Sequence, residues 1–208
     1  MVDRLKMVGR PVHQVWLPPL PAVIALDSLV GAPIVQPGRG LVAHVWPQHG
    51  RLRIPIGIVD LPLQQQQQPL IMDFGGPHGH LAVVGAPQTG RSTALRAIMM
   101  AGMLTHTPDE AQFYGIDFGG GSLHPYTSAP HVGTVAGRTD HALVRRTLAE
   151  IRLLIAVRET LFRELAVDSI ADFRARRDAG RLPAGVRPGC APPMYSCSST
   201  TGARCAQS

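Results

Sequence analysis

The sequence predicts an α/β fold with a parallel sheet, and two observations carry that prediction. From residue 81 onward, short apolar runs typical of strands alternate with longer segments of helical periodicity. A glycine-bounded loop, Gly85–Gly90, separates the first of these runs from the first helical segment. Prolines crowd the stretch before this region. We therefore expect a Pro-rich arm or linker over residues 1–50 and a folded domain over residues 51–188.

The N-terminal stretch favours an extended conformation. Pro18, Pro19 and Pro21 exclude a helix at this point of the chain. One interpretation is an arm that lies over a neighbouring molecule and is anchored by Trp16 and Leu17. A plain tethering linker explains the composition equally well.

The segment between the arm and the glycine loop predicts two short strands. Residues 54–60 alternate well enough for an edge strand, and residues 69–74 form a second apolar run that ends before a Gly-Gly-Pro turn. The five glutamines over 64–68 are of low complexity, and we expect them to form a surface loop.

The second half of the chain has the clearest periodicity. Residues 81–84 predict a short buried strand, and residues 92–104 predict a helix with apolar residues at helical spacing. Further strands are expected over 112–117 and 132–135, a long helix over 140–165 and a shorter one over 169–178.

Composition excludes several classes of function. The formal charge is +6, but Lys6 is the only lysine, so the arginine bias reflects GC-rich coding more than a choice of partner. Five arginines on the expected 140–165 helix alternate with glutamates, which is typical of a solvated face. Basic residues do not cluster with aromatic ones, so we expect no nucleic-acid groove.

Signals for export or membrane insertion are not found in the sequence. No apolar core follows Met1, and the longest apolar runs are far shorter than the roughly 20 residues that span a bilayer. We expect a cytoplasmic protein. Three cysteines, all within the last 20 residues, match neither a disulfide framework nor a zinc site.

The strongest motif is a phosphate-binding loop with the spacing G-x-x-x-x-G-[basic]-S. Its two glycines let the backbone wrap closely, so that successive N–H groups point at phosphate oxygens, and the following helix adds its N-terminal partial charge. Ser92 is placed to coordinate Mg²⁺, and Thr93 is expected near the α-phosphate. The predicted ATP-binding residues are Gly85, Ala86, Pro87, Gln88, Thr89, Gly90, Arg91, Ser92 and Thr93.

Arg91 stands where the motif has lysine. Lysine is a compact ammonium that reaches the β- and γ-phosphates, whereas arginine is a bulkier planar fork. The positive charge remains, so we expect nucleotide binding to persist and the positioning of the γ-phosphate for attack to suffer. Drift in a lysine-poor sequence and a tuned, slowly hydrolysing site both explain the replacement.

A second metal ligand is less clear from the sequence. Asp117 ends an expected strand, but Gly115 interrupts the apolar run before it. Asp117 is therefore a weak candidate for Mg²⁺ coordination, with capping of the strand end as the default interpretation.

Several uncommon strings occur in order along the chain: Val-Trp-Leu-Pro-Pro-Leu from Val15, Pro-Leu-Ile-Met-Asp from Pro69, the phosphate loop with its preceding Gly-His-Leu-Ala-Val-Val, Gln-Phe-Tyr-Gly-Ile-Asp-Phe-Gly-Gly-Gly from Gln112, and Pro-His-Val-Gly-Thr-Val-Ala-Gly-Arg from Pro130. With these strings the chain resembles the EccC proteins, which are FtsK/SpoIIIE-type ATPases of mycobacterial type VII (ESX) secretion. The resemblance runs from about Val12 to Pro188.

This resemblance implies a RecA-like P-loop NTPase domain that binds ATP and Mg²⁺ and corresponds to a later, soluble ATPase module of such proteins. It implies other EccC modules or ring-forming copies as partners, and small helical WXG100-type proteins as secretion substrates. It also implies a peripheral place at the inner membrane through a secretion complex.

The C-terminal sequence departs from the family pattern, which continues with an apolar strand, Asp and Trp-Gly (the Walker B segment). A one-nucleotide shift of the reading frame allows Tyr195–Ser199 to decode as five apolar residues, followed by Asp-Asp and Trp-Gly, if the serines use TCN codons. We therefore expect residues 189–208 to be an out-of-frame tail and the domain to be incomplete at its C-terminus. A genuine divergent C-terminus is the alternative, and AGY serine codons would support it.

Three functions follow from the sequence. The first is the ATP-binding module of a type VII secretion ATPase, with poor or no hydrolysis because the Walker B carboxylates are missing. The second is a nucleotide-binding interaction module that does not hydrolyse ATP. The third, an FtsK-type DNA translocase fragment, ranks last because the specific strings match the secretion branch.

Overall fold

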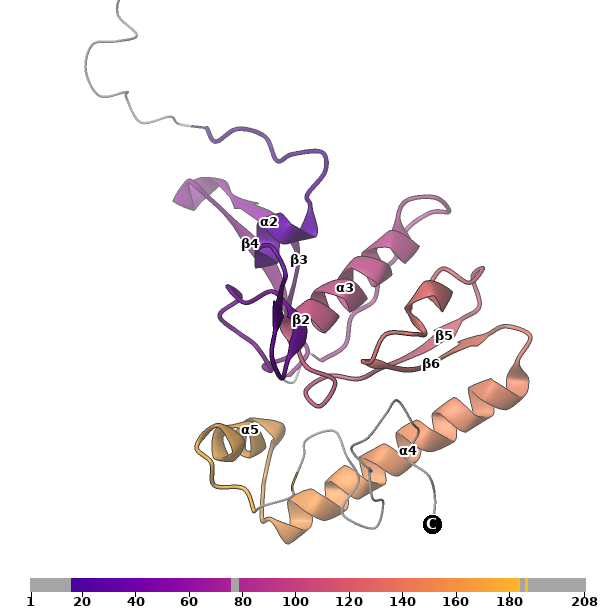
Figure 1. The fold of residues 1–208 in the computed structure, drawn as a ribbon. Helices are drawn as coiled ribbons and strands as arrows, with labels where there is room; N and C mark the ends of the chain where they lie inside the picture. The colour runs from indigo at the N-terminus through magenta and orange to yellow at the C-terminus, as the bar shows by residue number, and fades with distance from the viewer. Residues whose placement is uncertain (1–15, 76–78, 184–185, 187–208) are drawn as a thin grey trace, which may run out of the picture.

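The structure, a computed structural model, describes residues 16–75, 79–183 and 186 (Figure 1). The described part begins with the short helix α2, Leu26–Val30, and an antiparallel hairpin of β1, Ile34–Gln36, and β2, Gly40–Val42. These elements lie within the stretch predicted as an arm, yet they pack on the domain. Val30, Ala43 and Trp46 form one buried cluster with Leu104 of the helix that follows the glycine loop.

A longer antiparallel hairpin follows. It consists of β3, Arg53–Leu61, a single 3-10 turn, η1, Pro62–Gln64, and β4, Gln66–Asp73. The two strands predicted over 54–60 and 69–74 are confirmed, but β4 begins earlier than expected. The loop prediction for the glutamines is wrong for Gln66–Gln68, which pair with Leu61, Asp60 and Val59. Backbone pairing with β3 decides their conformation, while their amide side chains stay exposed.

The third pair of strands is parallel. β5, Phe113–Asp117, pairs with β6, Val132–Gly137, as their expected ranges of 112–117 and 132–135 predict. A loop containing the 3-10 turn η2, His124–Tyr126, joins them. Among the described residues the strands form three separate two-stranded sheets, so the parallel arrangement is confirmed only for β5 and β6.

The predicted strand over 81–84 is wrong in the described structure. No strand is assigned there, and the side chains of Leu81 and Val84 are exposed by 38% and 92%. A strand requires a neighbour for its N–H and C=O groups, and within the part of the chain that the structure describes no strand pairs with this segment. The apolar run therefore lies outside the sheets of the described residues.

All three longer helices lie where periodicity predicts them. α3 is Arg91–Thr105, α4 is His141–Glu164 and α5 is Ile170–Asp178. The Asp140 side chain caps α4 by accepting the N–H of Leu143 at 2.8 Å, and Ser169 caps α5 by accepting the N–H of Asp172 at 3.1 Å. These caps explain why both helices begin one residue after the expected start, directly after the capping residue.

Two buried clusters hold α3 in place. Leu104, near its C-terminal end, packs with Val30, Ala43 and Trp46, and its Met99 and Met103 pack with Val132 and Val135 of β6. α3 therefore joins the N-terminal elements to the parallel pair, and Figure 1 shows it between them. The stacked rings of Phe162 and Phe173, 5.3 Å apart, attach α5 to the end of α4.

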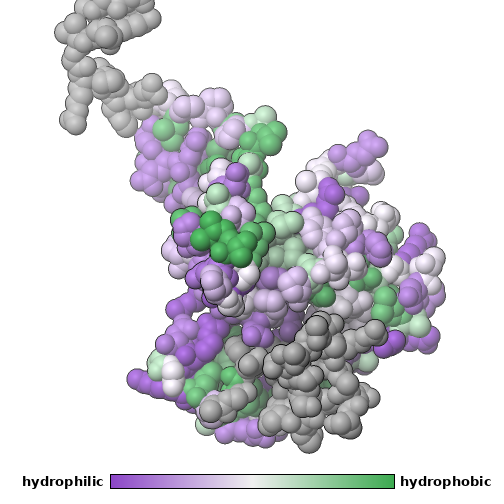
Figure 2. All heavy atoms as spheres, viewed as in Figure 1, coloured by the Kyte–Doolittle hydropathy of each residue, from purple (hydrophilic) through white to green (hydrophobic). Residues whose placement is uncertain are grey.

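Apolar residues are also exposed on the surface. In the view of Figure 2 they gather near α2 and the β1–β2 hairpin, where Val35, Leu41 and Val45 are more than half exposed. None of the helices in the described residues is long and apolar enough to cross a bilayer. The tail predicted over residues 189–208 lies outside the described residues.

Candidate phosphate-binding site

The glycine loop has the tight backbone that its sequence predicts. A Cβ added to Gly85 would lie 2.5 Å from Oγ1 of Thr89, so no larger residue fits at this position without a shift. The Thr89 hydroxyl donates to the carbonyl of Ala86 at 2.7 Å and closes the turn. Gln88 and Gly90 have φ angles of +64° and +90°, which places both in the left-handed region.

The first turn of α3 directly follows this loop. Its first residues, Arg91, Ser92 and Thr93, contribute N–H groups that have no acceptor within the helix. The loop and these three residues are all exposed, and the first turn holds no acidic residue. The helix N-terminus is thus open, positively polarised and free of a competing carboxylate, as a phosphate requires.

Among the described residues, the polar side chains of the first turn of α3 differ in whether they have a hydrogen-bond partner. The side chains of Arg91 and Ser92 are exposed, while the Thr93 hydroxyl accepts from Nη2 of Arg96 at 3.3 Å. Arg91 therefore keeps a cation next to the loop, on the first residue of the helix. Two cations, Arg91 and Arg96, lie within the first two turns of α3.

Asp117, the weaker candidate for a metal ligand, lies at the C-terminal end of β5. Its Oδ1 accepts the N–H of Gly119 at 2.8 Å, and its Oδ2 accepts the N–H of Leu123 at 3.0 Å and the hydroxyl of Ser122 at 3.3 Å. Burial alone would raise the pKa of Asp117, but these hydrogen bonds lower it below its usual value. The carboxylate is ionised and holds the glycine turn after β5.

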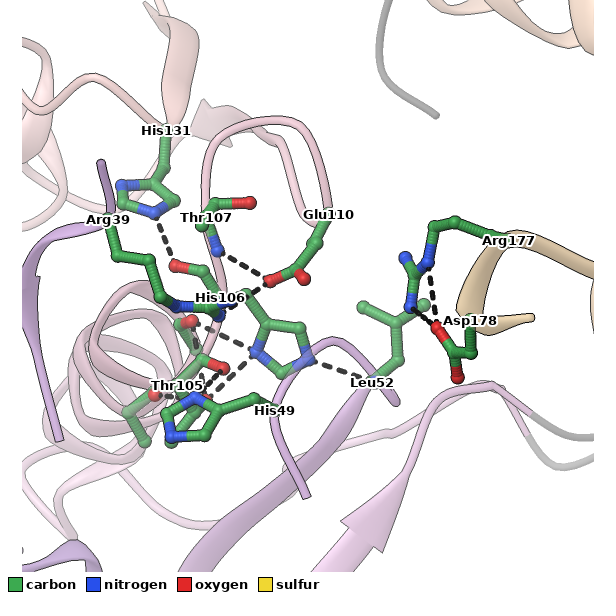
Figure 3. Close-up of polar contacts among 12 residues, drawn as sticks. Arg39, His49, Leu52, Thr105, His106, Thr107, Glu110, His131, Arg177 and Asp178 are labelled. Atoms are coloured by element: carbon green, nitrogen blue, oxygen red, sulfur yellow. Dashed lines mark hydrogen bonds and ion pairs between the residues drawn. The ribbon is translucent and has the colours of Figure 1, made fainter. Parts of the chain in front are cut away.

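Sequence reasoning missed a buried polar cluster at the other end of α3 (Figure 3). The N–H of Leu52 donates to Nε2 of His106 at 2.9 Å, so the proton of this imidazole is on Nδ1, which lies 2.9 Å from Oγ1 of Thr105 and 3.1 Å from the Gly102 carbonyl. His49 donates to the Thr105 carbonyl, and His131 donates to the His106 carbonyl.

An ion pair completes this cluster. Glu110 accepts from Arg39 at 3.0 Å and from the N–H of Thr107 at 2.9 Å. Burial lowers the pKa of His106 to about 4, so the imidazole is neutral near pH 7. The histidines are far apart in sequence and follow no ligand spacing, and the described residues contain no group of three or more potential metal ligands. The cluster is a structural junction that holds β3, α3 and β6 together.

Comparison with known proteins identifies the family to which this chain belongs. The sequence profile of the FtsK/SpoIIIE family matches residues 40–192, which is most of the chain. The chain belongs to the FtsK/SpoIIIE family. That family is RecA-like, so the predicted fold class is confirmed.

Similar curated proteins are components of type VII secretion systems. The chain is 43% identical over 180 residues to the ESX secretion system protein EccC of Thermomonospora curvata, which covers 86% of this chain and 14% of that protein. It is 45% identical over 177 residues to the ESX-4 secretion system protein EccC4 of Mycobacterium tuberculosis, covering 85% and 13%. The predicted resemblance to EccC proteins is confirmed, and the chain spans about one seventh of their length.

The chain is also similar in structure to solved EccC proteins. The cytoplasmic domain of the Thermomonospora curvata type VII secretion ATPase EccC superposes with a TM-score of 0.77 at 42% identity, over 88% of this chain and 21% of that one. A second structure, ATPases 2 and 3 of the same EccC in complex with a signal sequence peptide, has a TM-score of 0.71 at 42% identity, over 82% and 31%.

Proposed function

We propose that this chain is the ATP-binding module of a type VII secretion ATPase. The observation that carries the proposal is the exposed helix N-terminus of α3 behind a loop too tight for a side chain at Gly85. Family membership adds that relatives with the same sequence pattern are secretion ATPases. In this proposal the backbone of Gly85–Gly90 surrounds the phosphates and Arg91 supplies the cation.

The same proposal assigns Ser92 to Mg²⁺. Its side chain is exposed in the first turn of α3, where its hydroxyl would be free to hold the Mg²⁺ that accompanies the nucleotide. Asp117 remains the weaker candidate, because its carboxylate already accepts the N–H groups of Gly119 and Leu123. Bound Mg²⁺ would neutralise charge that develops on the phosphates.

We expect little hydrolysis from this chain. Arg91 replaces the lysine that positions the γ-phosphate, and the Walker B carboxylates that the family pattern provides were not found in the sequence. Binding of ATP without turnover is thus the expected activity of this module within a larger export motor. An out-of-frame tail over 189–208 would remove further carboxylates.

Partners follow from the relatives. The Thermomonospora curvata protein was solved with a signal sequence peptide, and its ATPase modules are linked in one chain. By analogy, other EccC-type ATPase modules or ring-forming copies are the proposed partners here, and WXG100-type proteins are the proposed cargo. The proposed location is the cytoplasm, next to the inner membrane through the secretion complex.

The test is a titration with ATP, with and without Mg²⁺, paired with phosphate-release kinetics. Ser92→Ala should weaken binding of Mg²⁺-ATP about tenfold while leaving binding of metal-free ATP nearly unchanged. Ser28→Ala, which removes a serine hydroxyl of α2 that donates to Ala25, is the matched control and should change neither.

Two outcomes would contradict parts of the proposal. If neither form of ATP binds to the wild-type chain, the nucleotide site is wrong. Steady phosphate release that Ser92→Ala abolishes would show that the module is a working ATPase and not a passive binder.

A further inference from the structure

A second polar pocket opens far from the glycine loop. It has a volume of about 580 Å³, and its polar lining comes from Gln48, Arg51, Arg53, Asp73 and Arg174, with Gly75 between them. These residues belong to the loop before β3, to β3 itself, to the end of β4 and to α5, which lies below the β3–β4 hairpin in Figure 1. Two segments distant in sequence thus bring three guanidinium groups to one pocket, those of Arg51, Arg53 and Arg174.

Arg174 is the central residue of this pocket. Only 9% of its surface is exposed, and within the described ranges its one hydrogen bond runs from Nη1 to the carbonyl of Arg51 at 3.4 Å. Among the described residues no carboxylate lies within ion-pair distance of this guanidinium. A buried arginine stays charged, and burial without a counter-charge is unfavourable.

The aspartates near the pocket are already paired with other arginines, so they do not neutralise Arg174. Arg51 pairs with Asp178 at 3.0 Å, and Asp178 also pairs with Arg177 at the same distance. Arg53 approaches Asp73 only at 3.6 Å, and its buried Nε has no hydrogen-bond acceptor. Around the pocket, four arginines (Arg51, Arg53, Arg174 and Arg177) therefore carry two more positive charges than the two aspartates, Asp73 and Asp178, can balance.

Two further features of the pocket favour a bound ligand: the lack of a side chain at Gly75 and, within the described residues, an unpaired side-chain amide oxygen at Gln48. A Cβ on Gly75 would lie 2.5 Å from Nη1 of Arg174 and 2.9 Å from the Arg51 carbonyl, so a side chain here would collide with the guanidinium. The amide oxygen of Gln48 is buried without a hydrogen-bond partner. The Gln48 amide can present its NH₂ group instead, as a further donor to an anion.

The pocket is separate from the phosphate loop. Leu52, between two of its arginines, hydrogen-bonds to His106 at the C-terminal end of α3, whereas Arg91 and Ser92 lie at the N-terminal end. A helix of this length separates the two ends by about 20 Å. A ligand bound in the glycine loop therefore cannot also contact the Arg174 pocket.

From these contacts we propose that the Arg174 pocket binds a small oxyanion, phosphate or carboxylate, held by Arg174 and Arg53. Both groups suit the planar guanidinium fork, which forms paired N–H···O bonds with either. The anion supplies the counter-charge that Arg174 lacks and an acceptor for Nε of Arg53.

The experiment follows backbone amide shifts of the full chain by NMR during titration with inorganic phosphate or with succinate, against sodium chloride at equal ionic strength. Arg91→Ala is present throughout, so that phosphate in the glycine loop does not contribute. The amides of Gln48, Gly75 and Ala171 should shift saturably with at least one of the two anions. A response to phosphate alone or to succinate alone identifies which group the pocket takes.

Substitutions then test the assignment. Arg174→Gln should lower the association constant about tenfold or more, whereas Arg145→Gln, an exposed arginine on α4, should leave it unchanged. Asp73→Asn keeps every arginine and removes a competing carboxylate, so it should strengthen binding even if Arg174→Gln fails to fold. Absent or non-saturating shifts with both anions, or equal weakening by Arg145→Gln, would overturn the proposal without affecting the nucleotide site.

Discussion

At the residue scale, the proposed function gives Arg91 the role of the cation beside the glycine loop. Arg91→Ala should weaken ATP binding about tenfold, because the exposed cation beside the loop is lost. Arg91→Lys should keep or raise the preference for ATP over ADP, because a compact ammonium can follow the loop to the γ-phosphate. Competition titrations of ATP and ADP measure both effects. Equal ATP affinities in all three proteins would show that this side chain does not contact the nucleotide.

His106 gives a second residue-scale prediction, a loss of stability in mild acid. Burial lowers its pKa from 6.5 to about 4, so between these values the unfolded chain binds a proton that the folded chain excludes. Stability is fully present above about pH 6.5 and falls as the pH drops toward 4. The free energy of unfolding should be about 2 kcal/mol lower at pH 5 than at pH 7 from this group.

The groups facing His106 do not reverse this sign. These groups are His49, Glu110 and Arg174. Burial would raise the pKa of Glu110, but the N–H of Thr107 and the ion pair with Arg39 lower it. Protonation of Glu110 in acid therefore also lowers the free energy of unfolding. Urea unfolding at several pH values is the measurement. His106→Gln should flatten the dependence, and His124→Gln, an exposed histidine, should not. An identical slope in wild type and His106→Gln would refute the assignment.

At the element scale, α3 approaches the strands closely at Gly102. An added Cβ would lie 2.6 Å from Cζ of Phe113 and 3.1 Å from Cδ1 of Ile54. Gly102→Ala should therefore destabilise the fold by about 1–3 kcal/mol, although alanine is the better helix former. Thermal or urea unfolding checks this. Gly137→Ala, where nothing lies within 4 Å, is the control, and equal effects of both would contradict the packing argument.

The elements also show where sequence reasoning succeeds. α3, α4 and α5 were predicted within one residue at each end, because their apolar spacing and the caps Asp140 and Ser169 are local signals. The glycine loop was predicted for the same reason: its constraint acts between neighbours in sequence, as Gly85 and Thr89 show.

The failures have one physical cause. Pairing partners of a strand are not local, so the sequence could not show that Gln66–Gln68 would pair with β3 or that residues 81–84 would lack a neighbour. The His106 cluster and the Arg174 pocket were missed because their residues come from distant segments. Only the folded backbone brings His49, His106 and His131 together.

At the scale of the whole molecule, the exposed apolar residues should limit solubility. Val35 of β1 is 80% exposed and pairs with Leu41 of β2, which is more than half exposed. Val35→Lys should raise the concentration at which the chain stays monomeric, because it breaks a contiguous apolar surface. Light scattering over a concentration series measures this. Leu63→Lys removes an apolar side chain, 99% exposed, at the tip of the other hairpin; an equal gain there would mean that added charge alone is responsible.

The attachment of α3 has a mechanical consequence. Its C-terminal end is fixed by the buried hydrogen bonds of Thr105 and His106, while its N-terminal turn is exposed beside the loop. The loop lies about 20 Å from this fixed end. A displacement of the loop by about 0.4 Å would therefore correspond to a tilt of α3 by about one degree. The hydrogen bonds of the fixed end reach Leu52, next to β3, and His131, next to β6, so we expect the occupancy of the loop to affect both strands through α3.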